Sequence, residues 1–570
     1  MSAPERADPI GPAFRRTDRR PARQVMAAAT WGTATRFLTY LVLFAALLGA
    51  ALTYRSAWSG DLSRVGDEAA HFVSSTMIRD YVLHAPGSNP IHFALEYYGH
   101  LPRVAIGHWP PLFHVVQAGV FLFTGASVAM ALGFQAVLAA SAAALTAALI
   151  YPRVGGGAQG ALVGAVAGLA VLLSPDVFGA VGTVMLDIFL SVLVLLTCIA
   201  WANYARTGRT AWAVAFALCA SAAILTKGNA YGLGLLPVLY MALSGQAALA
   251  ANWRTWLSAA IVLALTVPWY ALTYKISSDG FVYAWGLDYT ARAIPAYSRG
   301  ALNSLGPIGL AAFGLGTGLI AQRAWRGERD ETLLACAAGA IGLFLFIVVA
   351  PADIQERYLI AAMPAAIVVA ALGLWSLASR ECRARLPAMV VAGALLLNAA
   401  LTFRAPPVSS HVMDAAAHDI LASPDPAPLV LIAAGAKGEG ALTAAFAALD
   451  PAHAYYVIRA SKALAASNFL GTDYRARFSE ADDVRRWIAD SRIGWLVLDD
   501  DPDSLAMLHD KQLAALAAAG QHGWDLVSEH ASPKDSIRVF RLRGPPAIPA
   551  EIAAVLHQVA PDKVIGGKPN

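Results

Sequence analysis

Charged residues are scarce in this chain, and cysteine is almost missing from it. Only 14% of the 570 residues are charged, against roughly 25% in an ordinary soluble protein. The four cysteines, at positions 198, 219, 336 and 382, include no CxxC pair, and none follows position 382. This scarcity excludes a disulfide framework, a cysteine metal site and redox chemistry. The first three lie in apolar runs, where cysteine behaves as a small hydrophobic residue.

Long apolar runs take the place of the missing charge. Hydrophobic residues make up 57% of the sequence, and the mean hydropathy is +0.54. Several runs approach or reach the roughly 20 residues that span a bilayer. The clearest are residues 37–53, 184–200, 261–272, 333–349 and 359–377. The sequence therefore predicts a polytopic α-helical protein that is integral to the cell (inner or plasma) membrane.

The arginines between the apolar runs predict how the chain is oriented. Six of them lie within residues 1–34, which we expect to be a disordered cytoplasmic tail, as the positive-inside rule requires. This tail accounts for the net charge of +4 better than nucleic-acid binding does, because only Phe14 interleaves its arginines. We expect no nucleic-acid partner. Further arginines around positions 206, 323 and 380 mark cytoplasmic loops.

Counting the crossings places both ends of the chain. The arginines put the loop over residues 54–109 on the extracytoplasmic face, so an odd number of crossings must separate it from Arg206. Hydropathy shows four apolar blocks there, so either a short crossing is hidden near residues 175–185 or only three exist. Five crossings fit the length better and give about 13 spans in all. The N-terminus is then cytoplasmic and the C-terminus extracytoplasmic.

The chain changes character after Arg404. Charged residues become frequent and strand-like segments alternate with helix-like ones. The strand-like segments are 429–434, 454–459, 495–498 and 536–541, and the helix-like ones are 440–449, 482–490 and 505–519. This alternation predicts a small extracytoplasmic α/β domain with a largely parallel sheet over residues 405–570, after a membrane domain over residues 35–404.

One turn of the C-terminal domain follows a strand and opens a helix, as a phosphate-binding loop does. Its sequence, GAKGEG at residues 435–440, has neither the Walker spacing nor the GxGxxG spacing. The spacing favours a tight structural turn over a nucleotide site.

The loop over residues 54–109 holds the strongest candidates for chemistry. Asp67 and Glu68 follow Gly66 there, and carboxylates beside a membrane are costly unless they have a function. They are suited to act as a general base or as metal ligands, and equally to begin an amphipathic helix on the bilayer surface. The loop closes with His108, Trp109 and two prolines, which predict a helix start with an interfacial tryptophan.

Further polar residues interrupt apolar runs on the predicted outer side. Asp187 lies inside one run, Lys227 ends another in Leu-Thr-Lys-Gly, and Arg357 and Tyr358 open a late span in Glu-Arg-Tyr-Leu. Each charge is compatible with a structural ion pair. Because all of them share the predicted face of Asp67, the pattern favours one common pocket.

The order of these motifs resembles the GT-C class of membrane glycosyltransferases, in the branch of protein O-mannosyltransferases and aminoarabinose–lipid A transferases (glycosyltransferase family 39-like). The resemblance spans roughly residues 35–404. It implies that a sugar moves from a polyprenyl-phosphate donor to a lipid, glycan or protein acceptor on the extracytoplasmic face. It also implies that Asp67, with Glu68 beside it, is the catalytic carboxylate, and that Asp187 and Lys227 belong to the donor pocket.

A departing lipid phosphate needs cations around it. Those available on the outer side are Lys227, Arg292, Arg299 and Arg357, the last followed by Tyr358. Family members often carry a lysine immediately before the paired prolines, where this chain has Trp109 preceded by His108. His108 is therefore a candidate ligand for a divalent metal, and no other cofactor is expected. His92, Glu96 and His100 form a second candidate cluster, although an interfacial helix face explains their spacing as well.

A transporter or lipid flippase with a soluble outer domain is the alternative function. Asp187 and Lys227 would then be coupling residues inside the membrane. The apolar runs show no evident duplicated halves, however, and the acidic loop lies outside them. A non-catalytic scaffold is a third possibility, but about 13 spans exceed what an anchor needs. The sequence therefore favours the transferase, with the lipid-linked donor, the acceptor and membrane lipids as its partners.

Overall fold

The chain is described by a computed structural model over residues 22–105, 107–278, 280–381, 386–425, 427–467, 473–499, 506–520, 523–532 and 536–560, without the side chains of 22–31 and 380–381. Most of the predicted tail over residues 1–34 lies outside this description, as do the side chains of Arg380 and Cys382, which the sequence predicts to be cytoplasmic. The first helix, α1 (Ala22–Tyr54), begins inside the predicted tail. Its alanine-rich start explains this, because alanine has the highest helix propensity.

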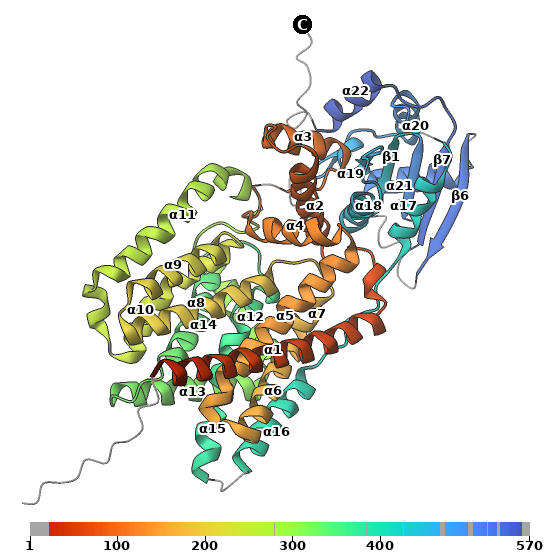
Figure 1. Ribbon diagram of the computed structural model, residues 1–570. Helices are drawn as coiled ribbons and strands as arrows, with labels where there is room; N and C mark the ends of the chain where they lie inside the picture. Colours follow the sequence, from red (N-terminus) through yellow and green to blue (C-terminus); the bar gives the residue numbers. More distant parts are fainter. Residues whose placement is uncertain are drawn as a thin grey trace, which may run out of the picture.

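Apolar helices of different lengths form a bundle along which α1 runs (Figure 1). In chain order they are α5 (Val128–Ile150), α6 (Gly157–Leu173), α7 (Pro175–Val181), α8 (Asp187–Thr207), α9 (Thr210–Ile224), α10 (Leu236–Ser244), α11 (Trp253–Ser278), α12 (Leu287–Leu305), α13 (Pro307–Trp325), α14 (Glu331–Val349), α15 (Met363–Glu381) and α16 (Leu386–Thr402). Two 3₁₀ helices, η3 (Gly228–Leu235) and η5 (Glu356–Ala362), precede α10 and α15.

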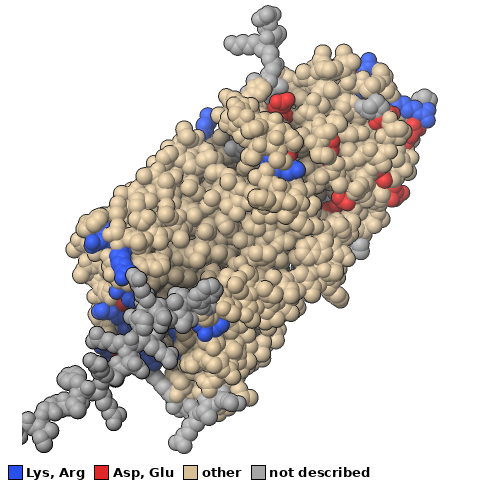
Figure 2. Space-filling model, in the orientation of Figure 1, with Lys and Arg blue, Asp and Glu red and all other residues tan. Residues whose placement is uncertain are grey.

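Six of the described helices are long and apolar enough to cross a membrane. The number rises to eight if the bent pairs α6–α7 and α12–α13, with angles of 71° and 103°, each form one span. The chain is therefore an integral membrane protein, while the count of 13 spans stays a prediction. The extra crossing expected near residues 175–185 corresponds to α7, which has seven residues. Figure 2 shows few charged side chains between the two ends of the bundle, as a lipid-facing band requires.

The C-terminal part forms a five-stranded sheet in the order β2-β1-β5-β7-β6, with β1 parallel to β2 and β5, and β7 antiparallel to β5 and β6. The strands are β1 (Leu429–Ala433), β2 (Tyr456–Arg459), β5 (Trp495–Asp499), β6 (Trp524–Ala531) and β7 (Ser536–Leu542), with a separate short pair, β3 (Ala465–Ala466) and β4 (Arg475–Ala476). The helices are α17 (Val412–Ala422), α18 (Gly435–Leu449), α19 (Ala460–Ala463), α20 (Ala481–Asp490), α21 (Leu508–Ala518) and α22 (Pro549–Val559).

Every predicted strand is present, but the sheet is mixed rather than largely parallel. The difference comes from β7, which runs antiparallel both to β5 and to β6, the edge strand that the sequence pattern does not reveal. Leu526 and Val527, adjacent in β6, are both about half exposed. The strand therefore lacks the strict alternation of apolar and polar residues by which a half-buried strand is recognised. The helix expected over residues 505–519 begins at Leu508 in the described residues.

The loop over residues 54–109 folds into helices that support the C-terminal domain. These are η1 (Ala57–Ser59), α2 (Glu68–His84) and α3 (Pro90–His100), followed by α4 (Leu112–Thr124). α18 packs against α2. The His100 ring stacks on Tyr456 with 3.9 Å between centroids, and the Arg103 guanidinium donates to the Ala436 carbonyl. One hydrophobic core continues from α1 and α2 into β1 and β7. The C-terminal domain therefore lies on the same side as Asp67.

The side of the membrane on which this domain lies is a testable prediction. A periplasmic-type reporter enzyme fused after Asn570 should be active, because the arginine-rich loops must stay in the cytoplasm. The same reporter inserted between Arg206 and Arg209 should be inactive, and a cytoplasmic reporter should give the opposite pattern at both places. An active extracytoplasmic reporter at residues 206–209 would invert the topology and contradict the placement of the site.

Candidate functional site

Asp67 stands at the start of α2 but does not cap that helix with its side chain. Its carboxylate instead accepts a hydrogen bond from Arg357 Nη2 at 2.9 Å, in an ion pair whose side chains are 34% and 19% exposed. Arg357 comes from η5, at the start of a late span. The pair therefore joins the loop over residues 54–109 to the start of α15, and helix capping does not account for Asp67.

Glu68 occupies a different environment from its neighbour. Its side chain is buried, and its carboxylate accepts backbone hydrogen bonds from Arg64 at 2.6 Å, Val65 at 3.0 Å and Val184 at 3.4 Å. Burial raises the pKa of Glu68 to about 7, although these backbone donors and the Arg64 charge oppose the rise. Glu68 thus ties the first loop to the turn before α8. The geometry assigns it a structural task, while its predicted catalytic role stays untested.

A second ion pair lies beside the first. Lys227 Nζ donates to Asp187 Oδ1 at 2.6 Å, and the Asp187 side chain is only 1% exposed. The Tyr358 ring lies under both cations, 4.4 Å from Lys227 Nζ and 5.9 Å from the Arg357 guanidinium carbon. Arg357 Nη1 also contacts Met185 Sδ at 3.5 Å. Two cations and two carboxylates from four elements therefore meet around one aromatic face, which attracts cations through its quadrupole.

His71 adds a buried imidazole to this cluster, one turn after Asp67. Its Nδ1 lies 3.1 Å from His114 Nε2, and its ring packs edge-on against Trp109 with 4.5 Å between centroids. Burial lowers the pKa of His71 well below its usual value, and His114, Arg357 and Lys227 lower it further, so the ring is neutral. Its Nε2 has no hydrogen-bond partner in the described chain. His71 lies four residues after Asp67, a spacing that places two side chains on one face of a helix, whereas no spacing rule points to His114.

A cavity of about 470 Å³ opens beside these groups and is here called the aromatic cavity. Asp67, His71, Lys227 and Arg357 line its polar end. Most of the remaining wall is aromatic or aliphatic and includes Trp109, Tyr231, Tyr270, Tyr274, Phe281, Trp285, Tyr289, Tyr297, Phe346, Ile347 and Tyr358. Four of these aromatic residues, Phe281, Trp285, Tyr289 and Tyr297, come from the segment that follows α11.

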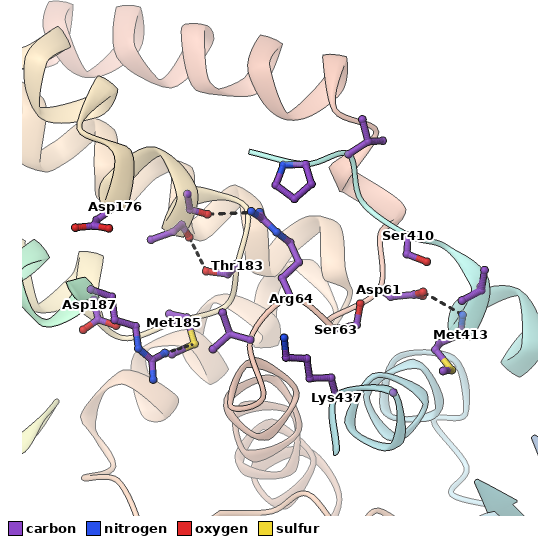
Figure 3. A pocket seen from close by; sticks show the side chains of 18 of the residues that line it. Asp61, Ser63, Arg64, Asp176, Thr183, Met185, Asp187, Ser410, Met413 and Lys437 are labelled. Carbon is purple, nitrogen blue, oxygen red and sulfur yellow. Dashed lines mark hydrogen bonds between the residues drawn. The ribbon is translucent and has the colours of Figure 1, made fainter. Parts of the chain in front are cut away.

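A second cavity, of about 580 Å³, lies between the bundle and the C-terminal domain and is here called the polar cavity (Figure 3). It is lined by the turn over residues 61–65, by parts of the segment over residues 175–187, and by Ala434, Lys437 and Gly438 of the C-terminal domain. Met185 and Arg357 line both cavities, whereas Asp187 faces the polar one. The two cavities are therefore separated by very few side chains.

The structure brings together five of the predicted site residues and leaves others apart. Arg292 and Arg299 occupy exposed positions on α12, and neither lines the aromatic or the polar cavity. His108 lines the aromatic cavity, but no group of three or more His, Cys, Asp or Glu in the described chain is placed to hold a metal. His100 packs on the C-terminal domain, and His92 and Glu96 are 4.0 Å apart on the surface.

The fold of this chain is similar to that of solved structures of another protein. The chain is similar to ArnT from Cupriavidus metallidurans bound to undecaprenyl phosphate, with a TM-score of 0.52, 15% identity, and coverage of 88% of this chain and 98% of that one. Against ArnT in the apo state the TM-score is 0.54, with 15% identity and coverage of 90% and 98%. No family model and no curated protein matches the chain. The predicted GT-C resemblance, in its aminoarabinose transferase branch, is thus confirmed at the level of the fold.

The two adjacent carboxylates make a matched pair for a stability test. Glu68→Gln should lower the free energy of unfolding by about 1–3 kcal/mol. The Glu68 carboxylate accepts from three backbone N–H groups, whereas the amide nitrogen of glutamine is itself a donor and cannot accept from them. Asp67→Asn should change it by less, since Asp67 is one-third exposed. Thermal unfolding of the purified variants in detergent measures both. Equal losses in the free energy of unfolding would show that the two carboxylates contribute equally to the stability of the fold, contrary to this prediction.

Proposed function

We propose that this protein transfers a sugar from a polyprenyl-phosphate donor to an acceptor on the extracytoplasmic face of the membrane. The observation that carries the proposal is the paired cluster of Asp67, Arg357, Lys227 and Asp187 at the meeting of two cavities. The ArnT-like fold supports it, because the solved ArnT structure contains undecaprenyl phosphate.

The aromatic cavity suits the donor. Its apolar wall matches a polyprenyl chain, whereas its polar end presents Lys227 and Arg357, the charges that a phosphate requires. Each cation is now matched by a carboxylate, as expected for charges at a membrane, where an unpaired ion is costly. A bound phosphate would compete with Asp67 for Arg357. Donor binding would then leave the Asp67 carboxylate available to a second ligand.

The transfer needs one base and one stabilised leaving group. The acceptor oxygen or nitrogen attacks the anomeric carbon, the bond from that carbon to the phosphate oxygen breaks, and the bonding electrons leave with the polyprenyl phosphate. Asp67 accepts the proton that the acceptor loses, while Lys227 and Arg357 stabilise the departing phosphate. Neutral His71 supplies a hydrogen-bonding nitrogen beside Asp67. The His114 contact fixes its ring orientation.

The buried Lys227–Asp187 pair is also the feature on which a transporter or flippase would depend. The two functions give different products, since a transporter makes no new glycosidic bond. Incubation of the purified protein with a panel of polyprenyl-phosphate sugars and candidate acceptors separates them. Appearance of glycosylated product together with free polyprenyl phosphate supports the transferase, and movement of intact lipid across a vesicle supports the alternative.

Asp67→Asn should lower the rate of transfer by about 100-fold or more, which is the usual scale for loss of a general base. The substitution keeps the shape of the side chain and removes only its basicity and charge. Product formation under donor saturation measures the effect. Turnover close to that of the unchanged protein would remove Asp67 from the mechanism.

Lys227→Ala should weaken binding of undecaprenyl phosphate by about tenfold or more, the effect expected for loss of a charge-assisted contact. Lys275→Ala is the matched control, because Lys275 is exposed at the end of α11 and does not line the aromatic cavity. Equilibrium binding in lipid nanodiscs measures both variants. Unchanged donor affinity combined with a lowered melting temperature would reduce Lys227 to a structural partner of Asp187.

A further inference from the structure

The helix α12 lies across one end of the bundle instead of along it. It meets α13, the helix that follows, at an angle of 103°. Asn398 of α16 holds this bend, since its Oδ1 accepts from the Ile308 and Gly309 N–H groups, both at 3.1 Å. Its Nδ2 donates to the Leu305 carbonyl at 2.8 Å. The bend is therefore built into the fold, and α12 runs nearly perpendicular to the next helix.

The contacts of α12 place it at the end of the bundle where η5 begins. The Tyr289 hydroxyl donates to the Ile347 carbonyl at 2.6 Å, near the end of α14. The Tyr297 hydroxyl donates to the Asp353 carbonyl at 3.1 Å, shortly before η5. Arg357 of the candidate site belongs to this same segment. A helix that lies across the ends of membrane spans is expected at the boundary between lipid and water.

The surface of α12 is divided into three faces of different chemistry. Its buried residues, at spacings of three or four, are Tyr289, Ala293, Tyr297, Gly300 and Ser304. An exposed apolar strip consists of Leu287, Ile294 and Leu302, which are 86%, 49% and 45% exposed. The exposed Arg292 and Arg299 lie about a third of a turn away from this strip, at roughly 100° per residue. Apolar and charged strips side by side are typical of a helix in the membrane interface.

A cavity of about 370 Å³, here called the α12 cavity, opens between α12 and the start of η5. It is lined by Ala296, Tyr297, Arg299 and Asn303 of α12 and by Ile354 and Glu356. Its volume lies in the roughly 300–1,000 Å³ range of small-ligand sites. Tyr297 also lines the aromatic cavity, so the α12 cavity lies beside the candidate donor site.

The α12 cavity contains one cation and one anion that do not pair with each other. Arg299 Nε donates to the Pro295 carbonyl at 3.3 Å, and Glu356 Oε1 accepts from Asn303 Nδ2 at 3.1 Å. Neither Arg299 nor Glu356 forms an ion pair within the described chain. This differs from the candidate site, where both cations are matched by carboxylates. At a membrane surface, the nearest groups that could match these two charges are those of lipid headgroups.

We propose that the α12 cavity binds the phosphoethanolamine headgroup of a membrane aminophospholipid, with the phosphate at Arg299 and the ammonium at Glu356. A guanidinium forms charge-assisted hydrogen bonds with phosphate oxygens, and an ammonium donates its N–H groups to a carboxylate. The exposed apolar strip of α12 then contacts the acyl chains. A choline headgroup carries the same two charges but has no N–H group, and a glycerol headgroup has no cation. The cavity therefore distinguishes between lipids.

The position of Glu356 gives this lipid a structural role. Glu356 directly precedes Arg357, so a lipid bound here holds the start of η5 at the level of the headgroups. The cation of the candidate site is thereby kept at a fixed depth in the membrane. The lipid site itself does not depend on the proposed sugar transfer.

The test measures lipid binding to the full-length protein in detergent by native mass spectrometry. Phosphatidylethanolamine, phosphatidylcholine and phosphatidylglycerol with identical acyl chains are compared. We expect phosphatidylethanolamine to bind most tightly, and Arg299→Ala to weaken its binding by about tenfold, as loss of a charge-assisted contact predicts. Glu356→Ala removes the acceptor for the ammonium. It should lower the affinity for phosphatidylethanolamine to that for phosphatidylcholine.

Three controls keep the result specific to this cavity. Arg292→Ala removes an exposed arginine of the same helix that does not line the cavity, and it should leave lipid binding unchanged. Arg299→Ala should leave the binding of undecaprenyl phosphate unchanged, because Arg299 does not line the aromatic cavity. Soluble phosphoethanolamine, which has no acyl chains, should displace the lipid only at much higher concentration.

Three results would overturn the proposal. Phosphatidylethanolamine might bind no more tightly than phosphatidylcholine, which would remove the role of the ammonium. Equal losses of lipid binding in Arg299→Ala and Arg292→Ala would show a general attraction to the charged helix. Displacement by soluble phosphoethanolamine at the concentration of the lipid would show a small-molecule site. Because no turnover is measured, failure of the lipid site stays distinct from failure of the proposed transferase activity.

Discussion

The arrangement of this protein depends on the contact between Asp67 and Arg357. One partner belongs to the loop over residues 54–109 and the other to the start of a late span, 290 residues away in the sequence. A partly buried carboxylate or guanidinium without a partner would carry a desolvation cost, so each stabilises the other. Lys227 and Asp187 form a second ion pair beside the first. Opposite charges can be kept at a membrane border in this way without a bound ligand, and a phosphate can later exchange with one of the carboxylates.

Much of the helical architecture was predictable from the sequence, because the length of an apolar run reflects the thickness of the bilayer. The alternation after Arg404 likewise identified the α/β domain, although β6 was missed since an edge strand with little burial carries no clear pattern. Helix existence is determined by composition. Helix pairing, span count and the bends at α7 and α12 depend on packing partners that are distant in sequence.

Most residues of the site could be predicted from the sequence, but the structural environment of each residue could not. Asp67 and Glu68 look equivalent in sequence, yet one is one-third exposed beside a cavity and the other is fully buried under backbone donors. Arg357 and Arg299 were both placed on the outer side by topology. The structure separates them, because Arg299 is exposed on α12 and Arg357 lines both the aromatic and the polar cavity. Sequence position specifies which side of the membrane a charge occupies, whereas the partner of that charge depends on three-dimensional packing.

The continuous core between α2 and the C-terminal domain has a consequence for the order of synthesis. The contact between Arg103 and Ala436 joins residues 333 positions apart, and the packing of α2 on α18 has a similar separation. Long-range contacts of this kind form only after the intervening chain has been made. Forming them also costs the entropy of closing the loop between the two residues. All the intervening membrane helices must therefore be made before α2 meets its partner. A nascent chain that stops after the last span would contain every charged residue of the central cluster and still lack the surface that holds the first loop in place.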